Sequence, residues 1–336
     1  MLRRQFLKTS ALAGSGIIAS ASTFNSTSAQ QITDGEAPTR IILSGYGPST
    51  SSFSQGLKRI GDRLESRFGD EVDIKYVYNI MDLSYNTTDL SRLVDAGVLS
   101  LAYQTMSTGV PELEVAALPF LFSDTATARA AMDGELGQSA IKSIEADSNF
   151  RVLGFFENGF RHVANNVRPV HTPGDMEGLV IRVLEIQSRA FELLGASPTT
   201  TPLPRVFSGL ESGELDGQEN PFENMVTYGL YRAQRYYTET YHSYLSRPIY
   251  VHRPSFDAWP EGLQAEMRDA VQDAVIFQRQ LHDQAEIDSA AVIREFGGEI
   301  VQLRSEQREA FIEAVAPIYT NLHDQYSREL LATVGL

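Results

Sequence analysis

Apolar positions near the start of the chain predict a strand, a helix and a second strand. Ile41–Leu43 is a short apolar run typical of a buried strand. From Phe53 to Phe68 an apolar residue returns every three or four positions, which predicts an amphipathic helix. Alternation from Val72 to Tyr78 predicts the next strand. This order predicts a parallel pair of strands, and ligands of such sheets lie beyond the carboxyl ends of the strands, here at the loop Ser44–Pro48.

A short phrase occurs twice in the chain. Leu93–Ser100 and Leu210–Asp216 each combine the end of a helix, a glycine and a strand that leads into a polar loop. The repetition predicts two similar α/β lobes, each of which presents one such loop. We expect a cleft between these lobes, which is the usual place for a small ligand.

The composition narrows the possible functions of the 336 residues. The absence of cysteine excludes disulfide scaffolds, thiolate metal sites and cysteine nucleophiles. The chain contains 28 Lys and Arg residues and 43 Asp and Glu residues, which gives a formal net charge of −15. Such a surface repels nucleic acid and anionic membranes, so we expect neither as a partner. A small anionic ligand remains possible where arginines are placed locally.

Residues 1–29 have the pattern of an export signal. Arg3, Arg4 and Lys8 form a basic start, an apolar stretch too short to span a bilayer follows, and small residues precede Ala29. The phrase Arg3–Lys8 resembles the twin-arginine export motif. We therefore expect a twin-arginine signal peptide and a protein exported to the periplasm, with an uncleaved basic tail as the alternative.

The usual motifs of enzymes are missing from the sequence. No two of the six histidines lie within four residues of each other, so helical metal-binding pairs are absent. The chain has no nucleophile elbow, no phosphate-binding loop and no dinucleotide fingerprint. This pattern favours a binding protein without metal or cofactor over an enzyme. A secreted hydrolase with dispersed catalytic carboxylates remains the alternative.

Two arginines interrupt apolar runs in the centre of the chain. Arg161 lies within Phe155–Val163, and Arg182 lies within Leu179–Val183. A buried charge is costly unless an anion pairs with it, and that anion is either an Asp or Glu of the chain or a ligand. Two such arginines within 22 residues favour a ligand. The planar guanidinium matches a carboxylate through two parallel hydrogen bonds.

Several phrases in this region resemble one family. They are Gly159-Phe-Arg161, Asn165-Asn-Val-Arg-Pro169, Gly178-Leu-Val-Ile-Arg182-Val, Leu194-Gly-Ala-Ser-Pro-Thr199 and Gly213-Glu-Leu-Asp-Gly-Gln-Glu-Asn-Pro221, with Ala117-Leu-Pro-Phe-Leu-Phe122 upstream. Together they resemble the substrate-binding proteins of tripartite ATP-independent periplasmic (TRAP) transporters, in the dicarboxylate-receptor branch. The resemblance implies a bilobal α/β fold like that of periplasmic binding proteins, with two mixed-sheet lobes. We expect lobe I to comprise 35–158 plus 246–285 and lobe II 159–245 plus 286–336.

The resemblance also implies which residues bind the ligand. By analogy with the family, Arg182 forms the main salt bridge to a ligand carboxylate, Arg161 supports it and Asn220 contacts the same group. Glu219, beside Asn220, leaves open a cation next to a keto acid. Four uncharged residues are candidates for the far end of the ligand, with a purely structural role as the alternative for each: Tyr46, Tyr103, Gln104 and Thr105. Because they carry no charge, the sequence favours a monocarboxylate.

The function implied by the resemblance is that of a receptor without catalytic activity. It would bind a small organic acid between its lobes and deliver it to a membrane permease driven by an ion gradient. We expect a monomer. A receptor that signals to a membrane sensor would have the same sequence features, so that alternative stays open.

Overall fold

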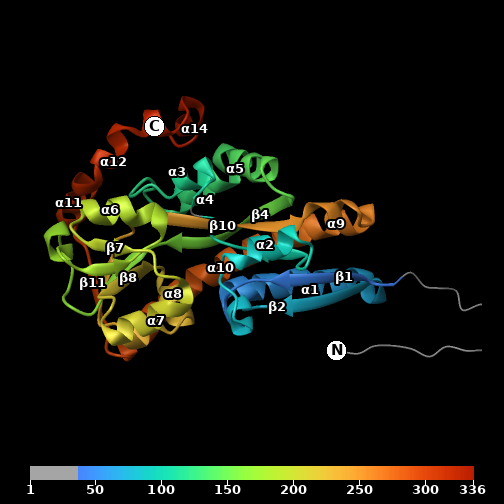
Figure 1. Ribbon diagram of the computed structural model, residues 1–336, viewed down its shortest axis with the longest axis horizontal. Coiled ribbons are helices and arrows are strands. Elements are labelled where there is room, and N and C mark those ends of the chain that lie inside the picture. Colours follow the sequence, from blue (N-terminus) through green and yellow to red (C-terminus); the bar gives the residue numbers. More distant parts are fainter. Residues whose placement is uncertain (1–36, 107) are drawn as a thin grey trace, which may run out of the picture. The chain divides into compact units, whose positions relative to one another are not determined.

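The first of two mixed sheets gathers strands from the N-terminal half and from the middle of the chain (Figure 1). The computed structural model describes residues 37–106 and 108–336, so the predicted signal peptide lies outside the described residues. In spatial order the strands of the first sheet are β2 (Val72–Val77), β1 (Thr39–Ser44), β3 (Leu101–Tyr103), β10 (Tyr244–His252) and β4 (Phe150–Phe160). The strands β1, β2 and β3 are parallel, whereas β10 is antiparallel to both of its neighbours. The predicted strand–helix–strand unit is thereby confirmed.

The second sheet is built from the central and C-terminal parts of the chain. Its strands are β11 (Glu299–Gln302), β9 (Tyr236–Glu239), β5 (His162–Asn165), β8 (Gly217–Asn220), β6 (Val180–Arg182) and β7 (Ser197–Thr199). Parallel pairs flank the central strand β5, which is antiparallel to both β9 and β8. Two mixed sheets with separate apolar cores confirm the predicted fold class.

Helices cover both sheets. Around the first sheet lie α1 (Ser52–Phe68), α2 (Asp89–Asp95), α3 (Pro111–Ala116), α4 (Thr125–Asp133), α5 (Glu135–Ala146) and α9 (Arg253–Asp257). The second sheet is accompanied by α6 (Ser188–Leu193), α7 (Leu203–Ser212), α8 (Phe222–Thr227) and α11 (Ser305–Val315). The helix α1 begins where the Ser51 hydroxyl accepts a hydrogen bond from the Ser54 N–H, and it buries Phe53, Leu57 and Ile60. This burial accounts for the periodicity seen in the sequence.

Three segments pass between the two sheets. The chain leaves the first sheet where β4 ends at Phe160, and it returns at Tyr244, the start of β10. The pairing of β4 with β10 is irregular beside Gly159, between Leu245 and Ser246. The third passage is the 35-residue helix α10 (Glu261–Glu295), which packs on the first sheet with its first half and on β11 near its end. Hinges of two-lobed proteins are made of such passages.

The C-terminal helices contact both halves of the protein. After α11 come α12 (Pro317–Thr320), α13 (Leu322–Gln325) and α14 (Arg328–Ala332), which run toward α3 and α5 in Figure 1. Leu322 and Leu331 pack against Val115 and Leu118 beside the first sheet. This arrangement differs from the expected division of the chain, which placed 286–336 wholly with lobe II. Local periodicity does not say which distant apolar face a short helix will meet.

The repeated phrase corresponds to a repeated structure. Gly97 after α2 and Gly213 after α7 have positive φ angles of 68° and 78°, which side chains with a Cβ rarely adopt. Each glycine turns the chain into a strand, β3 in one sheet and β8 in the other. The residues at the ends of these two strands, Gln104 and Asn220, line the same cavity.

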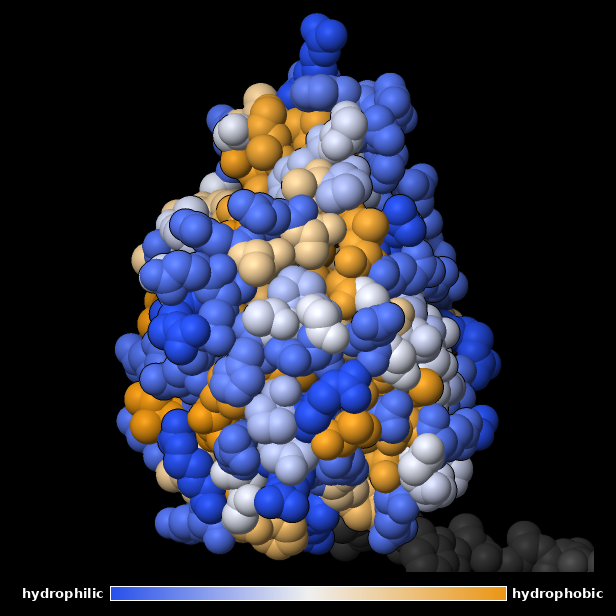
Figure 2. Space-filling view, turned by 90° about the vertical axis from the view of Figure 1, so that its left-hand side faces the viewer, coloured by the Kyte–Doolittle hydropathy of each residue, from blue (hydrophilic) through white to orange (hydrophobic). Residues whose placement is uncertain are grey.

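The surface on the side of the second sheet mixes polar and apolar residues. Figure 2 shows the apolar residues there in small groups separated by polar ones. Within the described part of the chain, no helix is both long and apolar enough to cross a membrane.

Candidate functional site

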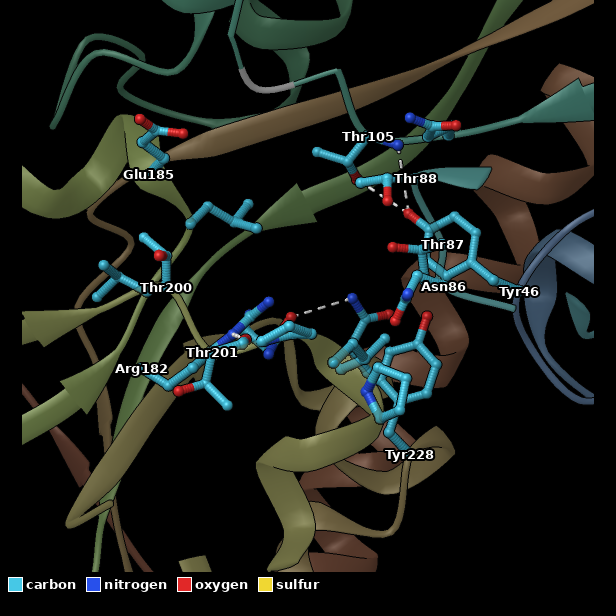
Figure 3. Close-up of a pocket in the computed structure, with 18 of the residues that line it drawn as sticks. Tyr46, Asn86, Thr87, Thr88, Thr105, Arg182, Glu185, Thr200, Thr201 and Tyr228 are labelled. Carbon is cyan, nitrogen blue, oxygen red and sulfur yellow. Dashed lines mark hydrogen bonds between the residues drawn. The ribbon is translucent and has the colours of Figure 1, made fainter. Parts of the chain in front are cut away.

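A cavity of about 390 Å³ lies between residues of the two sheets. From the first sheet and its loops come Tyr46, Gln104, Thr105 and Arg247, and from the second sheet and its loops come Arg161, Arg182, Thr201, Asn220, Asn224 and Tyr228. Figure 3 shows Arg182, Thr200 and Thr201 on one side and Tyr46, Thr105 and Asn86–Thr88 on the opposite side. The structure therefore brings together six of the seven predicted site residues.

Arg182 ends strand β6 and is 8% exposed. Its Nε donates to the Thr201 carbonyl oxygen at 3.0 Å, which fixes the plane of the guanidinium. No carboxylate of the described residues lies within 4.0 Å of it. Burial lowers the pKa of Arg182 to about 10, so it remains a cation at neutral pH. Its two terminal nitrogens are therefore available to an anion in the cavity.

Arg161 has a protein partner, in contrast to Arg182. It is 2% exposed and forms a buried ion pair with Glu219, which is also fully buried. Its Nη2 donates to Glu219 Oε1 at 3.0 Å and to Asn220 Oδ1 at 3.1 Å. Although burial opposes ionisation, Arg161 and His242 hold the pKa of Glu219 at about 2. The sequence left open whether the anion that pairs with Arg161 is a residue of the chain or a ligand. In the structure this anion is Glu219.

The Glu219 carboxylate accepts hydrogen bonds from two residues of the protein. Besides Arg161 it accepts the Leu184 N–H at 3.1 Å, and its Oε2 lies 3.4 Å from His242 Nε2. The groups that contact this carboxylate are therefore all groups of the protein. Among residues 37–106 and 108–336, no cluster of three or more His, Asp or Glu is placed to hold a metal ion.

Asn220 lies at the end of β8, opposite His162 in the antiparallel pair with β5. Its Oδ1 accepts from Arg161, and from Asn224 Nδ2 at 3.3 Å, while its own amide nitrogen donates to Gln218. One amide hydrogen of Asn220 is left for a ligand. Asn224, in the first turn of α8, was not predicted from the sequence but lines the same cavity.

The predicted distal residues form a connected polar group on the first sheet. The Tyr46 hydroxyl lies 3.0 Å from Thr105 Oγ1 and accepts the Thr105 N–H at 3.3 Å. Gln104 Oε1 accepts from Ser91 N and from the Tyr250 hydroxyl. These three residues border the cavity while also serving the structure of the loop after β3.

Tyr103 does not line the cavity. It is fully buried, its ring stacks on Phe53 with centroids 5.2 Å apart, and its hydroxyl accepts from the Tyr46 N–H at 3.4 Å. All three residues of β3 are buried, so alternation along this strand gave no sign of which side chain faces the ligand space. The structure supports the structural alternative for Tyr103 rather than direct contact.

Arg247 is a cavity residue that the sequence analysis missed. It lies in β10, is 3% exposed, and its Nε donates to Thr105 Oγ1 at 3.2 Å. Its guanidinium lies over the rings of Phe53 at 4.1 Å and Tyr46 at 4.7 Å. The signal was present, because Arg247 interrupts the apolar run Tyr244–Val251 as Arg161 and Arg182 interrupt theirs.

The fold and the cavity together define a two-lobed binding protein with a cationic ligand site. The chain matches, over residues 45–325, the family described as bacterial extracellular solute-binding protein, family 7. It therefore belongs to this family, which contains the solute-binding proteins of TRAP transporters, and the predicted resemblance is confirmed.

Individual relatives agree with this assignment. A solute-binding protein of Verminephrobacter eiseniae is 31% identical over 227 residues, or 67% of each chain. A TRAP solute-binding protein of Polaromonas, solved with D-erythronate, is 25% identical with a TM-score of 0.82, over 89% of this chain and 99% of that one. One from Xanthobacter autotrophicus, solved with β-D-galacturonate, is 27% identical with a TM-score of 0.79, over 88% and 97%. These likenesses support a carboxylate receptor rather than the alternative of a hydrolase.

Proposed function

We propose that this protein is the periplasmic receptor of a TRAP transporter, which binds a small organic acid in the cavity between its sheets and delivers it to the membrane permease. The observation that carries this proposal is Arg182, a buried cation at the cavity wall with no carboxylate partner in the described chain. A ligand carboxylate supplies the missing anion through two parallel hydrogen bonds.

The neighbours of Arg182 prepare the site for that carboxylate. The Thr201 carbonyl oxygen accepts a hydrogen bond from Arg182 Nε and so fixes the position of the guanidinium. Arg161, paired with Glu219, also donates to Asn220, and one amide hydrogen of Asn220 remains available to a ligand in the cavity. Because these groups are held before the ligand arrives, little conformational entropy is lost on binding.

The size of the cavity limits the ligand to a small acid. Its volume of about 390 Å³ is near the lower end of the roughly 300–1,000 Å³ typical of ligand pockets. Side chains from both sheets surround it, so a bound ligand bridges the two lobes and favours their closure. A closed surface that differs from the open one is what a permease would recognise. Export by the twin-arginine route and a monomeric state complete the proposal.

The test is carboxylate binding by the wild type and by Arg182→Gln. We would measure thermal unfolding with a panel of small carboxylates, with neutral sugars and amines as controls. A ligand at 100 times its dissociation constant stabilises the folded state by about 2.7 kcal/mol. We expect at least one carboxylate to do so in the wild type and none in Arg182→Gln.

The matched control is Arg67→Gln, which removes an exposed arginine at the end of α1 without touching the cavity. It should bind like the wild type. Unchanged affinity in Arg182→Gln would contradict the proposed role of this arginine. Turnover of a bound acid would instead restore the hydrolase alternative.

A further inference from the structure

Glu223 lies outside the ligand cavity, although Asn224, the next residue of α8, lines it. Glu223 is only 3% exposed. The backbone N–H of Ser52, the first residue of α1, donates to Glu223 Oε1 at 2.9 Å. Figure 1 shows α8 and α1 next to each other. A carboxylate from a helix of the second sheet thereby binds the first helix of the first sheet.

The donor of this hydrogen bond is fixed to the first lobe. The first N–H groups of a helix have no acceptor within the helix, and the positive end of the helix dipole lies there, so a carboxylate is a favourable partner. Gln278 of α10, which is fully buried, donates to Ser52 Oγ at 3.1 Å and to the Glu157 carbonyl oxygen of β4 at 2.9 Å. The beginning of α1 is therefore held against the first sheet independently of Glu223.

The acceptor is fixed to the second lobe and is an anion. Phe222, the residue before Glu223, packs in a core of the second sheet, and the Glu223 N–H donates to Glu286 Oε1 at 2.7 Å. The second carboxylate oxygen of Glu223 lies 2.7 Å from His282 Nδ1. Although burial opposes ionisation, the hydrogen bonds from His282 and Ser52 hold the pKa of Glu223 below its usual value. The contact with Ser52 is therefore a charge-assisted hydrogen bond between the lobes.

This contact lies where the chain passes between the sheets. His282 belongs to α10, and its ring lies against Gly159 near the end of β4, where φ is 81° and a Cβ would collide with His282 Nε2. A separate cavity of about 400 Å³ beside this point is lined by Phe160, Tyr241 and His282, which lie in or next to the three passages. Because donor and acceptor must stay within about 3.5 Å, a small rotation of one lobe about these passages would break the hydrogen bond.

We propose that Glu223 is a latch that holds the two lobes together and so determines ligand affinity, although it does not line the cavity. In the closed protein its carboxylate is shared by Ser52 of the first lobe and His282 of α10. When the lobes separate, Glu223 and the Ser52 N–H are left to water. A ligand enclosed by both lobes binds the closed form, so whatever stabilises that form raises the affinity. The latch acts on closure itself and is independent of which acid binds.

The test removes the Ser52 N–H while preserving the helix. Proline is favoured at the first position of a helix, and Ser51 already has the extended backbone, with ψ of 152°, that suits the residue before a proline. Ser52→Pro therefore breaks the contact, whereas Ser52→Ala keeps the N–H and removes only the hydroxyl bound by Gln278. The matched control is Ser305→Pro, the same substitution at the exposed first residue of α11.

The distance between the lobes is the measurement. The chain contains no cysteine, so Ser66→Cys in α1 and Glu211→Cys in α7 place one spin label on each lobe at exposed positions. We would record label distances by pulsed electron paramagnetic resonance in the ligand-free protein and with excess D-galacturonate or D-erythronate. We expect a short and a long distance, with a short-to-long ratio at least about tenfold lower in Ser52→Pro, the effect of losing a hydrogen bond to a charged group.

The controls and the outcomes are as follows. Ser305→Pro should stay within about threefold of the wild-type ratio, and Ser52→Ala should lie closer to the wild type than Ser52→Pro does. Equal distance distributions for Ser52→Pro and the wild type, with and without acid, would overturn the inference. A wild type that shows only the long distance under every condition would also overturn it. Because the ligand-free protein is measured too, a failure to bind any acid would contradict the proposed function and leave the result on the latch standing.

Variants of Glu223 test the same contact from the other side. Glu223→Gln keeps an oxygen for the Ser52 N–H but removes the charge, and it should lower the short-to-long ratio about fivefold. Glu223→Ala removes both and should lower the ratio further. A purely structural role would lower the Tm of both variants without changing the ratio, and this result would overturn the inference. Should Ser52→Pro fail to fold, the comparison of Glu223→Gln with the wild type decides.

Discussion

Arg182 should make the empty protein less stable than it would be with an apolar residue at this position. Burial lowers its pKa well below the usual value of an arginine, to about 10, and one pKa unit corresponds to about 1.4 kcal/mol. The folded state therefore disfavours this charge by roughly 3 kcal/mol. Replacing Arg182 by Met, an unbranched side chain, removes this cost but also removes the hydrogen bond to Thr201, worth about 1 kcal/mol. We expect Arg182→Met to stabilise the ligand-free protein by roughly 2 kcal/mol.

The assay is thermal unfolding without ligand and then with a saturating acid. For a folded chain of about 300 residues the gain corresponds to a rise in Tm of about 3 °C, whereas Arg67→Met on the surface should stay within about 0.5 kcal/mol of the wild type. Adding the acid should raise the Tm of the wild type and leave that of Arg182→Met unchanged. A ligand-free Arg182→Met protein that is less stable than the wild type would refute the reasoning, because the charge would then have been compensated within the protein.

Two further predictions concern buried ion pairs, Arg161–Glu219 and His282–Glu223. Glu219→Gln leaves the paired arginine without an anion and should lower the free energy of unfolding by roughly 3–5 kcal/mol, measured by urea denaturation; a loss below 1 kcal/mol would contradict this. His282 Nδ1 lies 2.7 Å from a carboxylate oxygen of Glu223. Burial opposes the protonation of His282, but the hydrogen bond to Glu223 and the negative charges of Glu286 and Glu157 outweigh it and raise the pKa of His282 to about 9. Because the folded pKa exceeds the usual 6.5, the stabilisation is complete below pH 6.5 and is lost as the pH rises through 9. Between pH 7 and 10 the wild type should lose stability more steeply than His282→Gln, and equal slopes would contradict the assignment.

The fold was predictable where local patterns determine it. The periodicity from Phe53 to Phe68 and the alternation that follows gave the first parallel pair of strands. The repeated phrase around Gly97 and Gly213 gave two equivalent strands whose ends meet at one cavity. In contrast, the return of Leu322 and Leu331 to the first sheet depends on apolar faces far apart in sequence, and no local signal encodes that pairing.

The candidate site was predictable only in part, for a similar reason. An arginine in an apolar run shows that an anion is needed but not where it comes from. The antiparallel register that pairs His162 with Asn220 brings Glu219 beside Arg161, 58 residues away along the chain. Arg182 and Arg247 meet no such acid, and only the packed structure distinguishes them from Arg161. The sequence analysis placed a boundary between the lobes at 245–246, beside Arg247, and did not consider the charge of this residue.

The helix α10 also constrains how this protein can change over evolutionary time. It is one uninterrupted helix whose early residues, such as Met267 and Val271, pack in the core of the first sheet, while Ala290 and Ile293 pack in a core of the second. Each residue of an α-helix turns the chain by about 100°. A single insertion or deletion between these two contact regions would rotate one face by that angle and move its apolar side chains away from their core. The two lobes can therefore vary independently in their loops, but the length of the helix that joins them is fixed.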